Sequence, residues 1–479
     1  MAALIPLATL ILVSLAGLAF FMLLPPESSR TGPLMTAAVL GGSIASSFLL
    51  LASLWPDRFL RLLYRVKVLG DVSLRFNLPE NLRLGSTLLA PLNLMIILWC
   101  SGLILLRRHL LRPYVPVLIF LLPFFAWQIV VLGIYPSQQG LVRFLSQLWV
   151  PLIFMVTLVS SMKIRDLQGI LTTTQILAAI MLLTVVSEWL VGWPAPIQQM
   201  DADIAWEQGR TVRFGGIWGI RSKAAESWAE MSYLVSLCTL LVRRRQGSLF
   251  FHTANIAFCL FVISLTGSKT PIFVLGSASV IAIALSVRAT RGVIVISIVA
   301  VGAFSLISSG LFDRTFERMQ TEQSRFQDNT TLDAMGTGRY GIWSAAIQNW
   351  RQAGPATVLL GGGLFSSEDF VNAGDRLGTE KDFGLHSQHL AVLIELGIVG
   401  LALYFLFWIG LVRLMILPTG ADEDLTYARL IAAGLLVGIL VRGIAGDVLN
   451  GVYYTWYLAI PLALLAKARL EPQEPHDPL

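Results

Sequence analysis

The chain has 479 residues, of which 55% are hydrophobic and only 13% are charged. Charged residues make up about 25% of a soluble domain, so this composition excludes a soluble, disordered or fibrous protein and favours a polytopic membrane protein. The net charge of +6 is typical of basic loops beside anionic lipid and does not point to nucleic-acid binding. The three cysteines lie in apolar runs, so we expect buried thiols and no disulfide or metal site (Cys100, Cys238 and Cys259).

Apolar runs long enough to cross a bilayer, which takes about 20 residues, recur along most of the chain. They predict an all-α bundle of about twelve transmembrane helices, with thirteen as the alternative. The candidate spans lie near 4–24, 34–54, 86–106, 113–134, 142–161, 168–192, 228–242, 250–266, 271–288, 292–310, 388–412, 425–443 and 453–468.

Short basic loops predict which ends of these spans face the cytoplasm. They carry the charges of Arg107, Arg108 and Arg112, of Lys163 and Arg165, of Arg243 to Arg245, of Arg288 and Arg291, and of the tail at Lys467 and Arg469. Alternation then places 193–227 and 311–387 on the outer side. From residue 107 onward, every loop agrees with this orientation.

The N-terminal part fits the alternation less simply. Segment 55–85 is also basic, and Arg58, Arg61 and Arg65 share one helical face, which is typical of an interfacial helix. If both 55–85 and the loop at Arg107 are cytoplasmic, the run 86–106 does not cross once. A broken or re-entrant helix around Pro91 resolves the conflict and gives twelve crossings, whereas a full crossing with an external N-terminus gives thirteen.

The large polar segment 311–387 divides the chain into N-terminal spans (1–310), an external loop and C-terminal spans with a short tail (388–479). Within the loop, 340–350 has helical periodicity, with Ile342, Ala346, Ile347 and Trp350 on one face. Pro355 follows as a stop, and the glycines of 361–363 predict a sharp turn or a close backbone approach. We therefore expect a partly helical, folded cap.

Five outward ionisable residues are candidates for chemistry: Arg213, Arg221, Lys269, Arg339 and His386. Each also has a structural interpretation: surface charge for the first two, snorkelling for Lys269, a salt bridge in the cap for Arg339 and a structural imidazole for His386. Together, the cations suit a diphosphate, because arginine binds phosphate oxygens in a bidentate manner. A nearby neutral imidazole suits a general base for a sugar hydroxyl.

No nucleotide-binding loop or hydrolase elbow is present, and the pair His386 and His389 lacks the spacing of a metal site, so we expect no cofactor and no metal. The main alternative function is a transporter or flippase for a lipid-linked oligosaccharide, which would use the same cations along a pathway. Transporters often show charges at the midplane, whereas these candidates cluster at span ends.

Several motifs, in order, resemble the signature of the O-antigen ligase and O-antigen polymerase family. They are Arg213-Phe214-Gly215-Gly216, Leu265-Thr266-Gly267-Ser268-Lys269, Thr337-Gly338-Arg339 with Trp343, Leu360-Gly361-Gly362-Gly363, and His386 followed by Glu395-Leu396-Gly397-Ile398-Val399-Gly400. The resemblance covers about 205–405.

The resemblance implies a metal-independent, inverting glycosyltransferase in the bacterial inner membrane, with its active site facing the periplasm. Its donor would be a glycan on undecaprenyl diphosphate, and its acceptor a lipid A–core sugar or another glycan in lipopolysaccharide or exopolysaccharide assembly. By position, His386 corresponds to the essential histidine of the family. Arg213 and Lys269 correspond to the diphosphate-binding positions, and Arg339 to the arginine of the large loop. Arg221 enters on chemical grounds alone.

Two departures from the signature leave questions open. Lys269 stands where arginine is usual, which keeps the charge but loses the bidentate fork. Ser387 follows His386 where asparagine is usual, and His389 adds a second imidazole, so either histidine is a candidate base. The sequence does not separate a ligase from a polymerase.

Overall fold

The computed structural model describes residues 52, 54–72, 85–192, 214–216, 223–242, 249–268, 270–286, 339–372, 385–416, 422–444, 446 and 455–470. Within these ranges the regular structure is helical and contains no strand, which confirms the predicted all-α architecture. Three predicted spans, 4–24, 34–54 and 292–310, lie wholly or almost wholly outside the described residues.

The helices follow the predicted spans closely. In chain order they are α3 (Pro56–Val72), α4 (Gly85–Leu106), the 3-10 helix η2 (Arg108–Tyr114), α5 (Val115–Ile134), α6 (Gln138–Gln147), α7 (Trp149–Val159), α8 (Asp166–Val191), α10 (Lys223–Val242), α11 (Leu249–Thr266), α12 (Thr270–Leu285), α16 (Arg339–Gln352), α17 (Pro355–Leu360), α18 (Ser367–Asn372), α19 (Gln388–Ile416), α20 (Glu423–Ile444) and α21 (Thr455–Leu470).

Six helical stretches of the described chain are long and apolar enough to cross a membrane. They are Arg108–Ile134, Gln138–Val159, Asp166–Val191, Leu249–Thr266, Gln388–Ile416 and Glu423–Ile444. Ile96–Leu106 and Thr270–Leu285 are shorter apolar helices. The protein is therefore a multi-pass membrane protein.

The expected break at Pro91 is absent from the structure. Helix α4 runs as one α-helix from Gly85 to Leu106. A proline inside a helix removes one backbone hydrogen bond but does not have to end the helix, because neighbouring groups can satisfy the freed carbonyl in a membrane.

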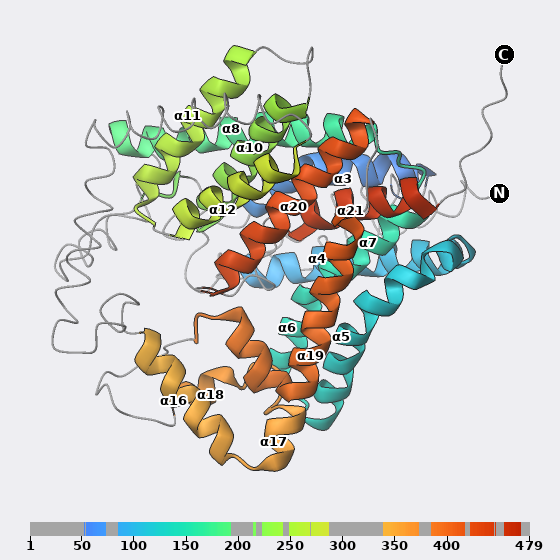
Figure 1. The fold of residues 1–479 in the computed structure, drawn as a ribbon, viewed down its shortest axis with the longest axis vertical. Helices are drawn as coiled ribbons and strands as arrows, with labels where there is room; N and C mark the ends of the chain where they lie inside the picture. The colour runs from blue at the N-terminus through green and yellow to red at the C-terminus, as the bar shows by residue number, and fades with distance from the viewer. Residues whose placement is uncertain are drawn as a thin grey trace, which may run out of the picture.

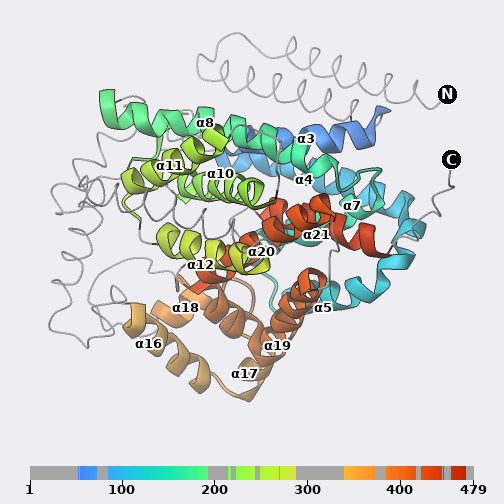
Figure 2. The same cartoon turned by 45° about the horizontal axis from the view of Figure 1, so that its top comes forward.

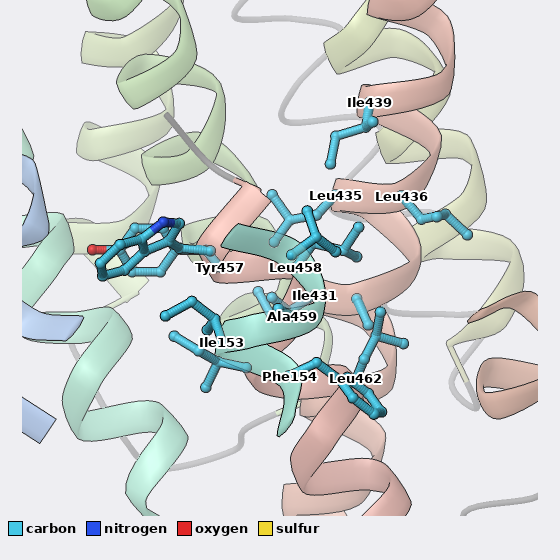
Figure 3. Packing of buried hydrophobic residues seen from close by; sticks show 14 of the residues in the cluster. Ile153, Phe154, Ile431, Leu435, Leu436, Ile439, Tyr457, Leu458, Ala459 and Leu462 are labelled. Atoms are coloured by element: carbon cyan, nitrogen blue, oxygen red, sulfur yellow. The ribbon is translucent and has the colours of Figure 1, made fainter. Parts of the chain in front are cut away.

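The core of the bundle is built by helices from distant parts of the sequence. In Figure 3, Ile153 and Phe154 of α7 lie against Ile431 of α20 and Leu458 of α21. Trp456 of α21 is also buried and stacks at 4.7 Å from the ring of Trp149. The buried cysteines (Cys100, Cys238 and Cys259) are free thiols, as predicted.

Several of the basic residues assigned to the cytoplasmic side lie together at one end of this bundle. Arg107 donates to Asp57 at 3.0 Å and to the carbonyl of Val159 at 3.1 Å. Lys467 donates to the carbonyls of Ser160 and Met162 at 2.6 and 3.1 Å. We call this the basic end, and it caps the last turn of α7, whose carbonyls have no partner within the helix.

Helix α3 packs alongside α8 and begins at the same basic end. Arg61 approaches Asp166 at 3.9 Å, and Tyr64 is fully buried. The hydroxyl of Tyr457, on α21, donates to the carbonyl of Tyr64 at 2.7 Å. The helix predicted to lie at the interface is thus tied into the bundle on its apolar side.

The described part of the segment 311–387 folds as predicted for a cap. Helices α16, α17 and α18 lie together beside α19, on one side of the bundle (Figures 1 and 2). Ala346 and Trp350 of α16 are buried in a separate apolar cluster with Val371 and Ile394. The cap therefore has a small core of its own, which joins it to the start of α19.

Candidate functional site

The first feature of the site is an interruption in α19. Gly397 has φ 68° and ψ −171°, so the predicted span 388–412 consists of two helical pieces, a short helix over 388–396 and a long one over 398–416. The predicted span is present as Gln388–Ile416, and the sequence does not predict its interruption at Gly397. This region of φ and ψ is accessible almost only to glycine.

The predicted glycine turn at 361–363 fills this interruption. The N–H of Gly362 donates to the carbonyl of Ile394 at 2.9 Å, and that of Gly363 donates to the carbonyl of Glu395 at 3.1 Å. A Cβ on Gly361 would lie 2.1 Å from the carbonyl oxygen of Glu395. The turn is therefore a close backbone approach, and it supplies donors to carbonyls that the broken helix leaves free.

His386 lies just before the short helix 388–396. Its φ of 48° is left-handed, which is unusual for a residue other than glycine, and its side chain is exposed. The neighbouring residues are fixed: the carbonyl of Leu385 accepts from the indole N–H of Trp343 at 2.9 Å, and the N–H of Gln388 donates to the carbonyl of Gly446 at 3.0 Å. The imidazole is therefore presented at the surface between α16 and the end of α20.

His389 has a different environment. Its Nε2 lies 3.2 Å from the carbonyl of Leu440 and its Nδ1 lies 3.1 Å from the hydroxyl of Tyr404. A carbonyl only accepts, so Nε2 carries the hydrogen, and in the neutral ring the lone pair of Nδ1 accepts from the tyrosine hydroxyl. Both ring nitrogens of His389 thus have partners within the protein.

Arg339 is the first residue of α16 and is half-buried. It precedes Trp343 by four residues, and positions i and i+4 lie on the same side of a helix. Because Trp343 bonds to the residue before His386, the structure brings the elements that carry Arg339 and His386 together. The role of the two residues in a common site stays a prediction.

Arg213, Arg221 and Lys269 lie outside the described residues. The residues next to two of them are described and meet one another. The N–H of Phe214 donates to the carbonyl of Leu265 at 3.3 Å, and the N–H groups of Gly215 and Gly216 donate to Glu188 Oε2 at 2.9 and 2.6 Å. The stretch that follows Arg213 is therefore held beside the end of α11, four residues before Lys269 in the chain.

Two buried ion clusters occupy the same end of the bundle, opposite the basic end. Arg442 of α20 pairs with Glu226 at 3.6 Å and with Glu230, both on α10. Arg143 of α6 pairs with Glu395 at 3.0 Å. No short motif points to Arg143, although an arginine in an apolar run needs a partner, which is a usable signal.

Among the residues that the structure describes, no three His, Cys, Asp or Glu side chains form a group that could hold a metal ion. The polar groups at this end of the bundle are the exposed imidazole of His386, Arg339 at the start of α16 and the backbone N–H groups of the glycine turn.

Comparison with protein families gives a match that includes Lys269, Arg339 and His386. Residues 254–405 match the family described as O-antigen ligase. The matched segment runs from α11 through Arg339, the glycine turn and His386 to the first turns after Gly397. Comparison with curated proteins gives no match. Over this segment the chain is similar to the O-antigen ligase family.

Proposed function

We propose that the protein is a membrane glycosyltransferase of the O-antigen ligase type, acting at the outer face of the bacterial inner membrane. The proposed donor is a glycan on undecaprenyl diphosphate. The acceptor is a hydroxyl of a lipid A–core sugar or of another glycan. The family match supports the class of enzyme, and the geometry around His386 supports the site.

The observation that carries the proposal is the placement of His386. Its imidazole is exposed at the end opposite the basic end. Before it, the carbonyl of Leu385 bonds to Trp343 of α16, and after it, the N–H of Gln388 bonds to Gly446, two residues beyond the end of α20. A general base must be held in one place and still be open to its substrate. His389 is half-buried, and its ring nitrogens contact Leu440 and Tyr404, so it is less open to a substrate than the exposed His386. We therefore assign the base to His386.

The charge distribution supports a diphosphate beside this base. Arg339 starts the helix that bonds next to His386, and the segments adjoining Arg213 and Lys269 are held together at the ends of α8 and α11. We assign Arg213, Lys269 and Arg339 to diphosphate binding, with Arg221 as a further cation. Cations placed where negative charge develops on a leaving group lower the transition-state energy.

In the proposed reaction, a ring nitrogen of His386 accepts the proton of the acceptor hydroxyl. The hydroxyl oxygen attacks the anomeric carbon from the face opposite the diphosphate, and the bond from that carbon to the diphosphate oxygen breaks. The leaving undecaprenyl diphosphate keeps the electron pair, and the anomeric configuration is inverted. The proposed step uses only the acid–base group and the cations, so we propose that no metal takes part.

The test is glycan transfer by the purified protein in detergent, with lipid-linked donor and candidate acceptors, in the presence and absence of EDTA. We expect transfer by the parent protein in EDTA and a loss of at least 100-fold for His386→Ala, because general-base catalysis contributes about 10²–10⁴-fold. His109→Ala changes another exposed histidine, beside Arg108 of the basic end, and is the matched control.

Near-normal transfer by His386→Ala would refute the base assignment. Absence of transfer by the parent protein with every donor, combined with movement of donor across sealed vesicles, would favour the flippase. Supplying lipid A–core and a second lipid-linked repeat in competition decides between ligase and polymerase.

A further inference from the structure

The short helix 388–396 connects the proposed base to the interior of the bundle. Its N-terminal end is fixed by the bond from Gln388 N–H to the carbonyl of Gly446 and by the contacts of His389 with Leu440 and Tyr404. Nine helical residues span about 13 Å, and a helix of that length moves as a rigid rod. The place of His386 therefore depends on how both ends of the rod are held.

The C-terminal end of the rod is held by a buried carboxylate. Glu395 Oε2 lies 3.0 Å from Arg143 Nε, and the two side chains are only 3% and 6% exposed. The other carboxylate oxygen, Oε1, accepts from the hydroxyl of Ser367 at 2.6 Å. One side chain thus joins the rod to α6 on one side and to α18 of the cap on the other.

Arg143 is itself fixed in place by the segment that carries the glycine turn. Its guanidinium carbon lies 5.8 Å from the ring centre of Phe365, a cation–π distance. One turn earlier on α6, Gly140 packs against Leu364, whose carbonyl oxygen and Cβ would each lie 3.1 Å from an added Cβ. Helix α6, the glycine turn and the rod are therefore a single packed unit at the point where α19 is interrupted.

A buried ion pair is weak evidence for stability, because desolvation of two charges offsets their attraction. Such a pair does restrain geometry, because a buried charge that moves away from its partner is left uncompensated, which is strongly destabilising. At Gly397 the backbone of α19 departs from helical φ and ψ, so a continuous helix does not set the relative orientation of its two pieces. The side-chain pair supplies the constraint that the interrupted backbone lacks.

We propose that Arg143 is a positioning residue: through Glu395 it sets the orientation of the short helix 388–396 and thereby the position of the His386 imidazole. This inference rests on the proposed function for its kinetic consequence, but not for its structural one. Arg143 touches neither substrate nor reacting atoms in this scheme. It acts through the helix.

The kinetic test uses Arg143→Leu and Arg143→Lys in the detergent transfer assay. We expect Arg143→Leu to lower kcat at least tenfold while the KM for the lipid-linked donor stays within twofold, because the diphosphate-binding groups are elsewhere. Arg143→Lys keeps the charge but lacks the planar guanidinium, so we expect a smaller decrease in kcat, about threefold. The double variant Arg143→Leu with Glu395→Leu removes the unpaired charge; it should regain stability but not kcat, because the constraint is still missing.

Arg107→Leu is the matched control, since it breaks the ion pair with Asp57 at the basic end. It should reduce stability without changing kcat. The fraction of folded protein is measured for every variant as the fraction of buried cysteines that stay unreactive to a fluorescent maleimide at the assay temperature. The temperature at which they become reactive gives the thermal stability. If Arg143→Leu does not fold, Arg143→Lys carries the comparison.

A second readout does not depend on activity. The rate at which diethyl pyrocarbonate modifies His386, followed by mass spectrometry, should change more than twofold in Arg143→Leu and not in Arg107→Leu. An unchanged rate together with unchanged kcat in folded Arg143→Leu would overturn the inference. The inference would also be overturned if activity fell only in proportion to the amount of folded protein in both Arg143→Leu and Arg107→Leu. A changed modification rate in a protein without transfer activity would keep the structural inference and refute the proposed function.

Discussion

Gly397 offers a direct test of the interruption in α19, through the substitution Gly397→Ala. With φ at 68° and ψ at −171°, an alanine is forced into a region that costs about 1–3 kcal/mol. Its Cβ would also lie 2.3 Å from the carbonyl oxygen of Leu359 and 2.6 Å from the nitrogen of Gly361. Both neighbours are backbone atoms, so the glycine turn must move away.

That movement loosens the bonds from Gly362 and Gly363 to the carbonyls before the interruption, each worth about 0.5–1.5 kcal/mol. The combined cost is about 2–6 kcal/mol, a large part of a typical stability of about 5–15 kcal/mol. The shift in melting temperature per kcal/mol falls with chain length and is about 1 °C for a chain of this size, so we expect a drop of about 2–6 °C.

The assay is thermal unfolding in detergent, followed with a maleimide dye that becomes fluorescent when it reacts with thiols. It suits this protein because its three cysteines are free and buried. Gly276→Ala is the control: Gly276 lies within α12, and a Cβ there meets no atom within 4 Å. In a helix interior, alanine is favoured over glycine by about 0.5–1 kcal/mol. Equal melting temperatures for the two variants would refute the reasoning about Gly397.

Glu188→Ala removes the carboxylate that anchors the stretch after Arg213 and should raise the KM for the lipid-linked donor about tenfold. Glu188→Gln keeps an acceptor oxygen and should change this KM less than threefold. Equal effects of the two substitutions would argue against an anchoring role. Burial raises the pKa of Asp57, but the Ser161 N–H and Arg107 more than offset this and hold it below its usual range. The carboxylate therefore stabilises the fold above about pH 4, and this contribution disappears as the pH falls through the lowered pKa. Asp57→Asn should lower the melting temperature at pH 7 and have a smaller effect below pH 4; a difference that does not depend on pH would contradict the linkage. Lys467→Met removes the donor to the carbonyls of Ser160 and Met162, just after α7, and should lower stability by about 2–3 kcal/mol in the same unfolding assay. The control Lys163→Met changes an exposed lysine and should have no such effect.

Hydropathy predicted most of the fold, because a helix in lipid has to satisfy its own backbone. The ends of α8, α11 and α20 lie within two residues of their predicted positions. The cap helix α16 follows from periodicity, since Ala346 and Trp350 are both buried. The interruption at Gly397 did not follow. Its immediate neighbours, Leu396 and Ile398, are apolar, and hydropathy does not register a change of backbone direction.

The candidate site was predictable residue by residue but not as an arrangement. His386 and Arg339 were identified from motifs, and the structure joins their elements through the bond from Trp343 to Leu385. Arg143 was missed because its partner Glu395 lies on a distant helix, and no short pattern connects the two. Opposite charges in separate apolar runs are still a recognisable signal, since each needs a counter-charge in the membrane.

The bond from Tyr457 to Tyr64 joins groups that are 393 residues apart in the chain. The ribosome makes α3 long before α21, so one side of α3 waits through the synthesis of the intervening helices before this neighbour exists. Until then, lipid or an insertion factor has to cover that side. A truncation before Thr455 will therefore act on α3 as well as on the segment that it removes.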